Sequence, residues 1–135
     1  MNKKLQDQLI QKAIEAAKKS YAPYSNFHVG AALLVAGEKR VFTGGNVENA
    51  SYGLTICAER AALSAAVSAG YRRFEAIAVV AGKKKAVVPC GACLQALAEF
   101  CKPDLIVLAA TAARPAKIKI FKLRDLLPLA FRFKS

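Results

Sequence analysis

The chain has 135 residues, of which 55% are hydrophobic and 22% are charged, and its formal net charge is +12. This composition excludes a disordered chain, and no apolar run approaches the roughly 18 residues that a membrane span requires. We expect one domain, residues 1–135, located in the cytoplasm because the N-terminus has no apolar core of the signal-peptide type. The positive charge could attract nucleic acid or another anion. A solvated basic surface is the simpler explanation, so we expect no specific nucleic-acid partner.

The first half of the chain predicts a helix, two strands and a second helix. Apolar residues recur at helical spacing between lysines over residues 5–19, which indicates an amphipathic helix. Residues 27–36 and 40–48 flank a short turn and are typical of an antiparallel strand pair. An alanine-rich helix follows over residues 57–70, and Gly70 closes it.

The second half predicts strands that alternate with helices. The predicted elements are a strand over 74–82, a helix over 90–101, strands over 104–110 and 116–123, and a short helical end over 123–128. The continuous apolar runs AIAVV and LIVLAA indicate strands that are covered on both faces. We therefore expect an α/β fold, a three-layer helix–sheet–helix sandwich with a mixed five-stranded sheet.

Three cysteines stand at the starts of the second and third predicted helices: Cys57, Cys90 and Cys93. The C-x2-C spacing puts Cys90 and Cys93 on one helix face, and a helix N-terminus favours the thiolate form. Three thiolates could converge on one tetrahedral zinc ion with its fourth position open, as in catalytic zinc sites. A structural zinc knuckle or an apolar cysteine pair would also explain C-x2-C alone. We interpret Cys101 as a buried apolar residue and His28 as a partly exposed strand residue.

Glu59 and Arg60 follow Cys57 directly. Residues two apart on a helix do not share a face, so Glu59 is poorly placed to bind the same metal as Cys57. We expect Glu59 instead to transfer protons at the open coordination position. Arg60 could donate to the sulfurs and offset the negative charge of three thiolates around zinc. C-x-E, followed 33 residues later by P-C-x2-C, matches the signature of the zinc-dependent deaminases, with cysteine in the place that histidine can also take.

With the flanking residues included, the chain resembles the cytidine deaminases of the small homotetrameric type, which have three cysteine ligands. The resemblance runs from YAPYSNFHVGAALL through GGNVENASYGLTICAERAAL and PCGACLQ to LLPLAF. It implies that zinc is bound by Cys57, Cys90 and Cys93. It also implies that Glu59 shuttles protons and that Arg60 donates hydrogen bonds to ligand sulfurs.

The resemblance implies substrate contacts as well. Asn46-Val47-Glu48 would hold the ribose hydroxyls, because alternate residues of a strand point to one face. Phe27 would lie against the pyrimidine ring, and Phe131 of a neighbouring subunit would cover it. Backbone groups around Ala58 and Cys90 could position the base. The alternatives are a core role for either phenylalanine and a solvated strand end for NVEN.

The expected activity is zinc-dependent hydrolytic deamination of cytidine and 2′-deoxycytidine in pyrimidine salvage. The expected enzyme is a homotetramer with shared active sites and one Zn²⁺ per subunit. We expect no membrane partner. Two alternatives of the same class are a deaminase of nucleic-acid bases and a deaminase of a nucleoside antibiotic. The N-x-E motif disfavours the first, because a closed ribose pocket leaves no path for a continuing strand. An alternative of another class is a zinc-stabilised binding protein without catalysis. Glu59 argues against that alternative, because a purely structural site has no use for it.

Overall fold

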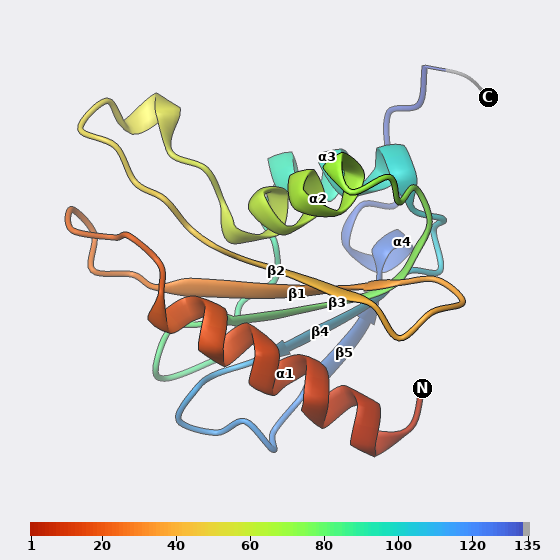
Figure 1. The fold of residues 1–135 in the computed structure, drawn as a ribbon, viewed down its shortest axis with the longest axis horizontal. Coiled ribbons are helices and arrows are strands. Elements are labelled where there is room, and N and C mark those ends of the chain that lie inside the picture. The colour runs from red at the N-terminus through yellow and green to blue at the C-terminus, as the bar shows by residue number, and fades with distance from the viewer. Residues whose placement is uncertain (134–135) are drawn as a thin grey trace.

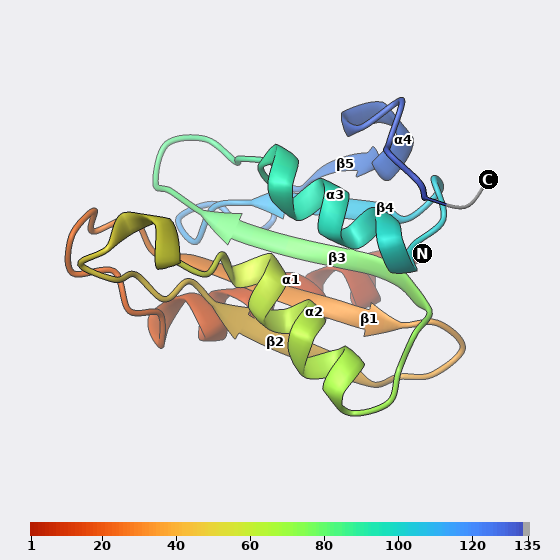
Figure 2. The same cartoon turned by 90° about the horizontal axis from the view of Figure 1, so that it is seen from above.

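The computed structural model describes residues 1–133, and within them a single sheet lies between two layers of helices (Figures 1 and 2). The elements in chain order are α1 (Lys3–Lys18), β1 (Val29–Val35), β2 (Val41–Gly45), the 3₁₀ helix Tyr52–Leu54, α2 (Ala58–Ser68), β3 (Phe74–Ala81), α3 (Gly91–Phe100), β4 (Ile106–Ala110), β5 (Lys119–Lys122) and α4 (Leu123–Leu126). No helix in this part of the chain is long and apolar enough to cross a membrane.

The sheet has five strands in the order β2-β1-β3-β4-β5. β1 pairs with β2 and with β3 in antiparallel fashion, and β4 and β5 are also antiparallel. β3 and β4 are parallel neighbours, joined by a crossover through α3. The predicted mixed five-stranded sheet is therefore confirmed.

The two faces of the sheet bury separate hydrophobic cores. α1 covers one face and packs Leu9 and Ile10 against the side chains of that face. α2 and α3 cover the other face, where Leu63 and Leu97 are buried among the side chains of the central strands. The three-layer helix–sheet–helix architecture is confirmed, and it puts α2 and α3 side by side (Figure 2).

Two glycines let the helices approach the sheet closely. A Cβ atom at Gly30 would overlap the carbonyl oxygen of Ala13 in α1. A Cβ atom at Gly44 would lie 2.6 Å from the backbone N of Ala62 and 2.7 Å from the carbonyl oxygen of Ala58. Gly44 therefore fixes how closely the first turns of α2 pack on β2, and with them the position of Cys57.

Most element boundaries lie within two residues of the sequence-based predictions, and three differences are larger. The second strand ends at Gly45, so Asn46–Glu48 lies beyond it, with the Val47 backbone bridged to Tyr21 and Ile56. The last strand covers only Lys119–Lys122, because a turn occupies residues 115–116. The 3₁₀ helix Tyr52–Leu54 was not predicted, since three residues are too few to show a helical pattern.

Candidate active site

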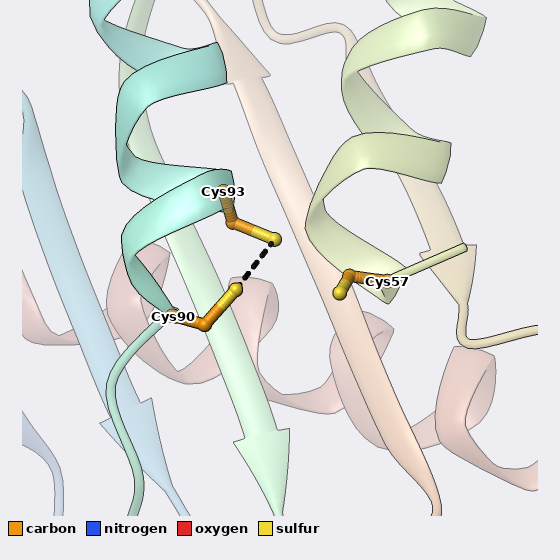
Figure 3. A group of neighbouring side chains, drawn as sticks. All are labelled: Cys57, Cys90 and Cys93. Carbon is orange, nitrogen blue, oxygen red and sulfur yellow. Dashed lines mark hydrogen bonds between the residues drawn. The ribbon is translucent and has the colours of Figure 1, made fainter. Parts of the chain in front are cut away.

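The N-termini of α2 and α3 bring the three cysteines together. Cys57 is the N-cap residue of α2, and Cys90 is the N-cap residue of α3. Cys93 lies one turn further along α3, on the same face as Cys90. Because α2 and α3 lie side by side on one face of the sheet, the sulfur atoms converge between the two helix starts (Figure 3).

The geometry of these sulfur atoms fits zinc. The three Sγ atoms lie within 4.8 Å of one another, and the Sγ atoms of Cys90 and Cys93 are 3.6 Å apart. A tetrahedral site with Zn–S bonds of about 2.3 Å requires sulfurs roughly 3.8 Å apart. Cys57, Cys90 and Cys93 are the only cluster of this kind among residues 1–133, so the ligand set predicted from the sequence is brought together as expected.

The electrostatics of the cluster also fit a cation. Burial raises the pKa of the Cys93 thiol, and negative charge on Glu59 and Cys57 raises it further. Burial opposes ionisation of Cys90 too, but hydrogen bonds from the Cys93 and Ala92 backbone N–H groups outweigh it and lower the pKa of Cys90. The helix N-terminus thus stabilises one thiolate, whereas a divalent cation would offset the repulsion among all of them.

Glu59 and Arg60 lie beside the sulfur cluster without joining it. Glu59 is in the first turn of α2 and only 5% exposed, and it does not belong to the metal-ligating group. Burial raises the pKa of its carboxyl group, which suits a group that carries protons. Arg60 donates from Nη2 to Cys57 Sγ at 3.6 Å, the contact expected of a residue that tunes a ligand thiolate. The Arg60 Nε is buried without a hydrogen-bond partner among the described residues.

The side chain of Asn46 is buried and holds the backbone on either side of His28. Its Nδ2 donates to the carbonyl oxygen of Phe27 at 2.9 Å, and its Oδ1 accepts from the backbone N–H of Val29 at 2.9 Å. The ring of Phe27 is partly exposed, so the core alternative does not describe it. Asn46 therefore fixes the position of Phe27 in addition to any contact that it makes with a sugar.

Glu48 is held by the turn that precedes β1. Its carboxylate accepts hydrogen bonds from the backbone N–H groups of Tyr24, at 2.9 Å, and Ser25, at 3.1 Å, and from the Ser25 hydroxyl. The Ser25 Oγ in turn accepts from the Phe27 N–H at 3.0 Å. Ser25 was not singled out in the sequence analysis, because no local signal connects position 25 to position 48.

Phe131 lies near the end of the described chain, with its ring 70% exposed. Its backbone carbonyl accepts from Gln95 Nε2 at 2.8 Å, and its N–H donates to Gln95 Oε1 at 3.3 Å. A ring with this exposure is not a core anchor in its own chain. Gln95 was missed by sequence reasoning, although a polar residue in the apolar stretch CLQALA was a usable signal.

Ala58 and Cys101 occupy the places expected of them, whereas His28 does not. Ala58 is the first residue of α2 and is fully buried. Cys101 is buried at the far end of α3, where burial raises the pKa of its thiol to about 12. The prediction that His28 lies in a strand is wrong, because β1 begins at Val29 and His28 belongs to the exposed loop before it. The Nδ1 of His28 lies 2.6 Å from the Ser20 hydroxyl. Neither Cys101 nor His28 belongs to the sulfur cluster.

The chain is similar to known deaminases over most of its length. The family model described as "Cytidine and deoxycytidylate deaminase zinc-binding region" matches residues 3–109. A cytidine deaminase of Halalkalibacterium halodurans is 50% identical over 91% of this chain and 91% of that protein. One from Mycobacterium tuberculosis is 46% identical over 88% of this chain and 84% of that protein. The crystal structure of a cytidine deaminase from Burkholderia pseudomallei matches with a TM-score of 0.87 and 48% identity, and the match covers 97% of this chain and 100% of that chain. The chain therefore belongs to the zinc-dependent cytidine and deoxycytidylate deaminase family.

Proposed function

We propose that the protein deaminates cytidine and 2′-deoxycytidine hydrolytically, giving uridine and 2′-deoxyuridine with release of ammonia. The observation that carries the proposal is the buried carboxylate of Glu59, which lies beside a three-sulfur cluster without being part of it. The relatives named as cytidine deaminases support the same activity. A purely structural zinc site gives no reason to bury a carboxylate at that position.

The cysteines and Glu59 have different roles in the proposed reaction. Cys57, Cys90 and Cys93 would hold zinc, which when bound would lower the pKa of a water molecule and so supply a nucleophile near neutral pH. Glu59 takes a proton from the attacking water and delivers it to N3 of the pyrimidine while the water oxygen forms a bond to C4. Glu59 then transfers the second proton to the amine on C4, the C4–N bond breaks, and ammonia leaves.

The substrate contacts follow from the residues around the Phe27 turn. Phe27 lies against the pyrimidine ring, while Asn46 and Glu48 bind ribose hydroxyls, with Val47 between them on the backbone. Groups near Ala58 and Cys90 position the base. The hydrogen bonds that tie Phe27 to Asn46, and to Glu48 through Ser25, support this assignment, because they hold the ring-binding and sugar-binding residues in one unit.

The working enzyme is a homotetramer of single-domain subunits, in which Phe131 of one subunit covers the substrate of another. The exposed ring of Phe131 supports this arrangement, because such a side chain is available to a second copy. We place the enzyme in pyrimidine salvage in the cytoplasm. Its cysteine ligands must stay reduced to bind zinc, and a reducing compartment keeps them so.

The test is an assay of the zinc-loaded protein with four substrates: cytidine, adenosine, single-stranded DNA and a cytosine nucleoside antibiotic of the blasticidin type. We expect loss of cytidine absorbance, with no comparable reaction of the other three, and loss of activity on chelation that zinc restores. Deamination of DNA or of the antibiotic in preference to cytidine would contradict the proposed substrate. A zinc-loaded protein inactive on all four would indicate a binding protein instead.

A further inference from the structure

Two loops gather positive charge at one edge of the sheet. Lys83, Lys84 and Lys85 follow β3, and Arg114 and Lys117 follow β4. Because β3 and β4 are parallel neighbours, both loops leave the same edge, and they lie close together in both views (Figures 1 and 2). The region outside the carboxyl ends of parallel strands is where α/β sheets usually bind ligands.

A small pocket forms where these loops meet. It has a volume of about 100 Å³ and is lined by Lys84, Lys85, Ala86, Thr111, Arg114, Lys117 and Lys119. None of its lining residues is acidic. The ion pairs among residues 1–133 are Lys3–Asp7 and Lys18–Glu15, so none of the five lining cations forms an ion pair there. Five unpaired cations around one pocket repel one another, and an anion bound among them would relieve that repulsion.

A larger cavity adjoins this cationic pocket. It has a volume of about 700 Å³ and shares Lys84 and Lys85 with the smaller pocket. Its apolar lining comes from α1, β3 and the loop after β3, and includes Ile14, Ala17, Val80 and Val87. Its polar lining residues include Lys18, Asn26 and His28 as well as the shared lysines. A mainly apolar cavity of this size with a few polar groups is typical of small-molecule sites.

The larger cavity is separate from the sulfur cluster. Neither Glu59 nor any of the three clustered cysteines lines it or the cationic pocket. Phe27 is the one residue of the proposed substrate site that lines the larger cavity. A ligand in these two cavities would therefore occupy a second site, next to the Phe27 turn.

We propose that these two cavities bind a nucleotide, with its phosphates in the cationic pocket and its base in the apolar cavity. The cations surround one pocket. A strand of nucleic acid instead needs a basic groove that follows its backbone, with aromatic side chains on which its bases stack. A free inorganic phosphate would leave the adjoining apolar cavity without an occupant. A nucleoside di- or triphosphate matches both halves.

The test is calorimetric titration of the zinc-loaded protein with ATP, whose adenine does not match the proposed cytidine site. We compare the wild type with Lys117→Ala/Lys119→Ala, which removes two cations near the phosphates, and with Lys4→Ala/Lys39→Ala as the matched control. Lys4 and Lys39 are exposed and line neither cavity. We expect saturable binding that the pocket variant weakens at least about tenfold and the control changes less than about twofold.

Further titrations distinguish the source of the phosphate. Inorganic triphosphate and adenosine should each bind at least about tenfold more weakly than ATP, because each fills only one half of the site. Equal weakening in both double variants, triphosphate that binds as tightly as ATP, or no saturable ATP binding would each overturn the proposal. The proposal would also be overturned if single-stranded DNA bound more tightly than ATP and the pocket variant lost that DNA binding. If the pocket variant does not fold, Lys84→Ala/Lys85→Ala repeats the test on the other loop.

Discussion

Ser25 connects the two residues that are expected to contact opposite ends of the nucleoside. Its hydroxyl donates to Glu48 and accepts from the N–H of Phe27, while Asn46 holds the carbonyl oxygen of Phe27. Phe27 is thus fixed at both of its backbone polar groups by side chains. A change at Ser25 should therefore weaken the proposed contact of Phe27 with the pyrimidine ring and the proposed contact of Glu48 with the ribose together. Ser25 does this without direct contact with the zinc ligands.

The first prediction concerns Ser25→Ala. Loss of the hydroxyl removes one of the three hydrogen bonds to Glu48 and the hydrogen bond to the Phe27 N–H. We therefore expect KM for cytidine to rise by about tenfold while kcat changes less than about threefold. Zinc content should not change. The increase in KM should be smaller for 3′-deoxycytidine, which lacks one of the hydroxyls that Glu48 is expected to hold. Ser68→Ala, an exposed change at the end of α2, is the control.

If kcat and zinc content fell together in Ser25→Ala, Ser25 would support the fold of the whole site rather than the substrate contacts. If the increase in KM were the same for cytidine and 3′-deoxycytidine, Ser25 would not act through Glu48.

The second prediction concerns the pH dependence of this turn. Hydrogen bonds from the Ser25 hydroxyl and from the Ser25 and Tyr24 backbone, with a smaller effect of the nearby His28, hold the pKa of Glu48 below its ordinary value of 4.5. The turn is therefore stabilised at every pH above 4.5 and loses that contribution as the pH falls through the lowered pKa. NMR amide signals of Tyr24 and Ser25 should titrate together, with a midpoint below 4.5. A midpoint above that value would contradict the contact.

At the scale of the elements, the site is an arrangement of two helix starts on one sheet. The cysteine spacing and the approximate starts of α2 and α3 were readable from the sequence, because helix starts and apolar strand runs are local patterns. The bonds between Glu48 and Ser25 and between Gln95 and Phe131 were not, because each joins residues far apart in the chain. The strand order β2-β1-β3-β4-β5 was likewise unavailable, because strand pairing is decided by tertiary packing.

The third prediction tests how β2 positions α2. In Gly44→Ala, the new methyl group would press on the backbone of Ala58 and Ala62, so the first turns of α2 must move and carry Cys57 with them. We expect a loss of about 1–3 kcal/mol in the free energy of unfolding, together with weaker zinc retention in competition with a chelator. Gly53→Ala is the control, because a Cβ atom there would meet nothing within 4 Å. Equal behaviour of the two variants would show that β2 does not fix the metal site.

At the scale of the whole molecule, large apolar side chains are exposed near the C-terminus. Leu129, Phe131 and Phe133 are 94%, 70% and 89% exposed. They alternate with Ala130, which packs against the core, and with Arg132, which donates to the carbonyl oxygen of Ala98 at 2.7 Å. Ala130 and Arg132 thus attach this segment to the core and to α3, and the large apolar side chains between them are available to another subunit, which supports the proposed assembly.

The fourth prediction follows from that assembly. Phe131→Ala should raise KM for cytidine with zinc content unchanged. If Phe131→Trp proves inactive alone, mixing it with inactive Glu59→Gln should restore part of the activity after subunit exchange. Some sites would then combine an intact Glu59 with an intact Phe131 of another subunit. No recovery, with exchange confirmed by mass, would mean that Phe131 serves only its own chain.

The distribution of charge is also a property of the whole molecule. The net charge of +12 was countable from the sequence, but its concentration around one pocket depends on the parallel pairing of β3 and β4. The expectation of no specific nucleic-acid partner stays a prediction, and the DNA titration described above measures it.

The role of Glu59 is the central claim, and activity and zinc content of Glu59→Gln, measured on the same preparation, test it most directly. Glutamine keeps the shape of the side chain but cannot carry the proton. We expect one zinc ion per chain, as in the wild type, and a loss of at least about 100-fold in kcat. Glu99→Gln, an exposed change on α3, should retain full activity. Loss of zinc from Glu59→Gln would show that Glu59 is a metal ligand. Retained activity would show that Glu59 does not transfer the proton. Either result would contradict the proposed role of Glu59.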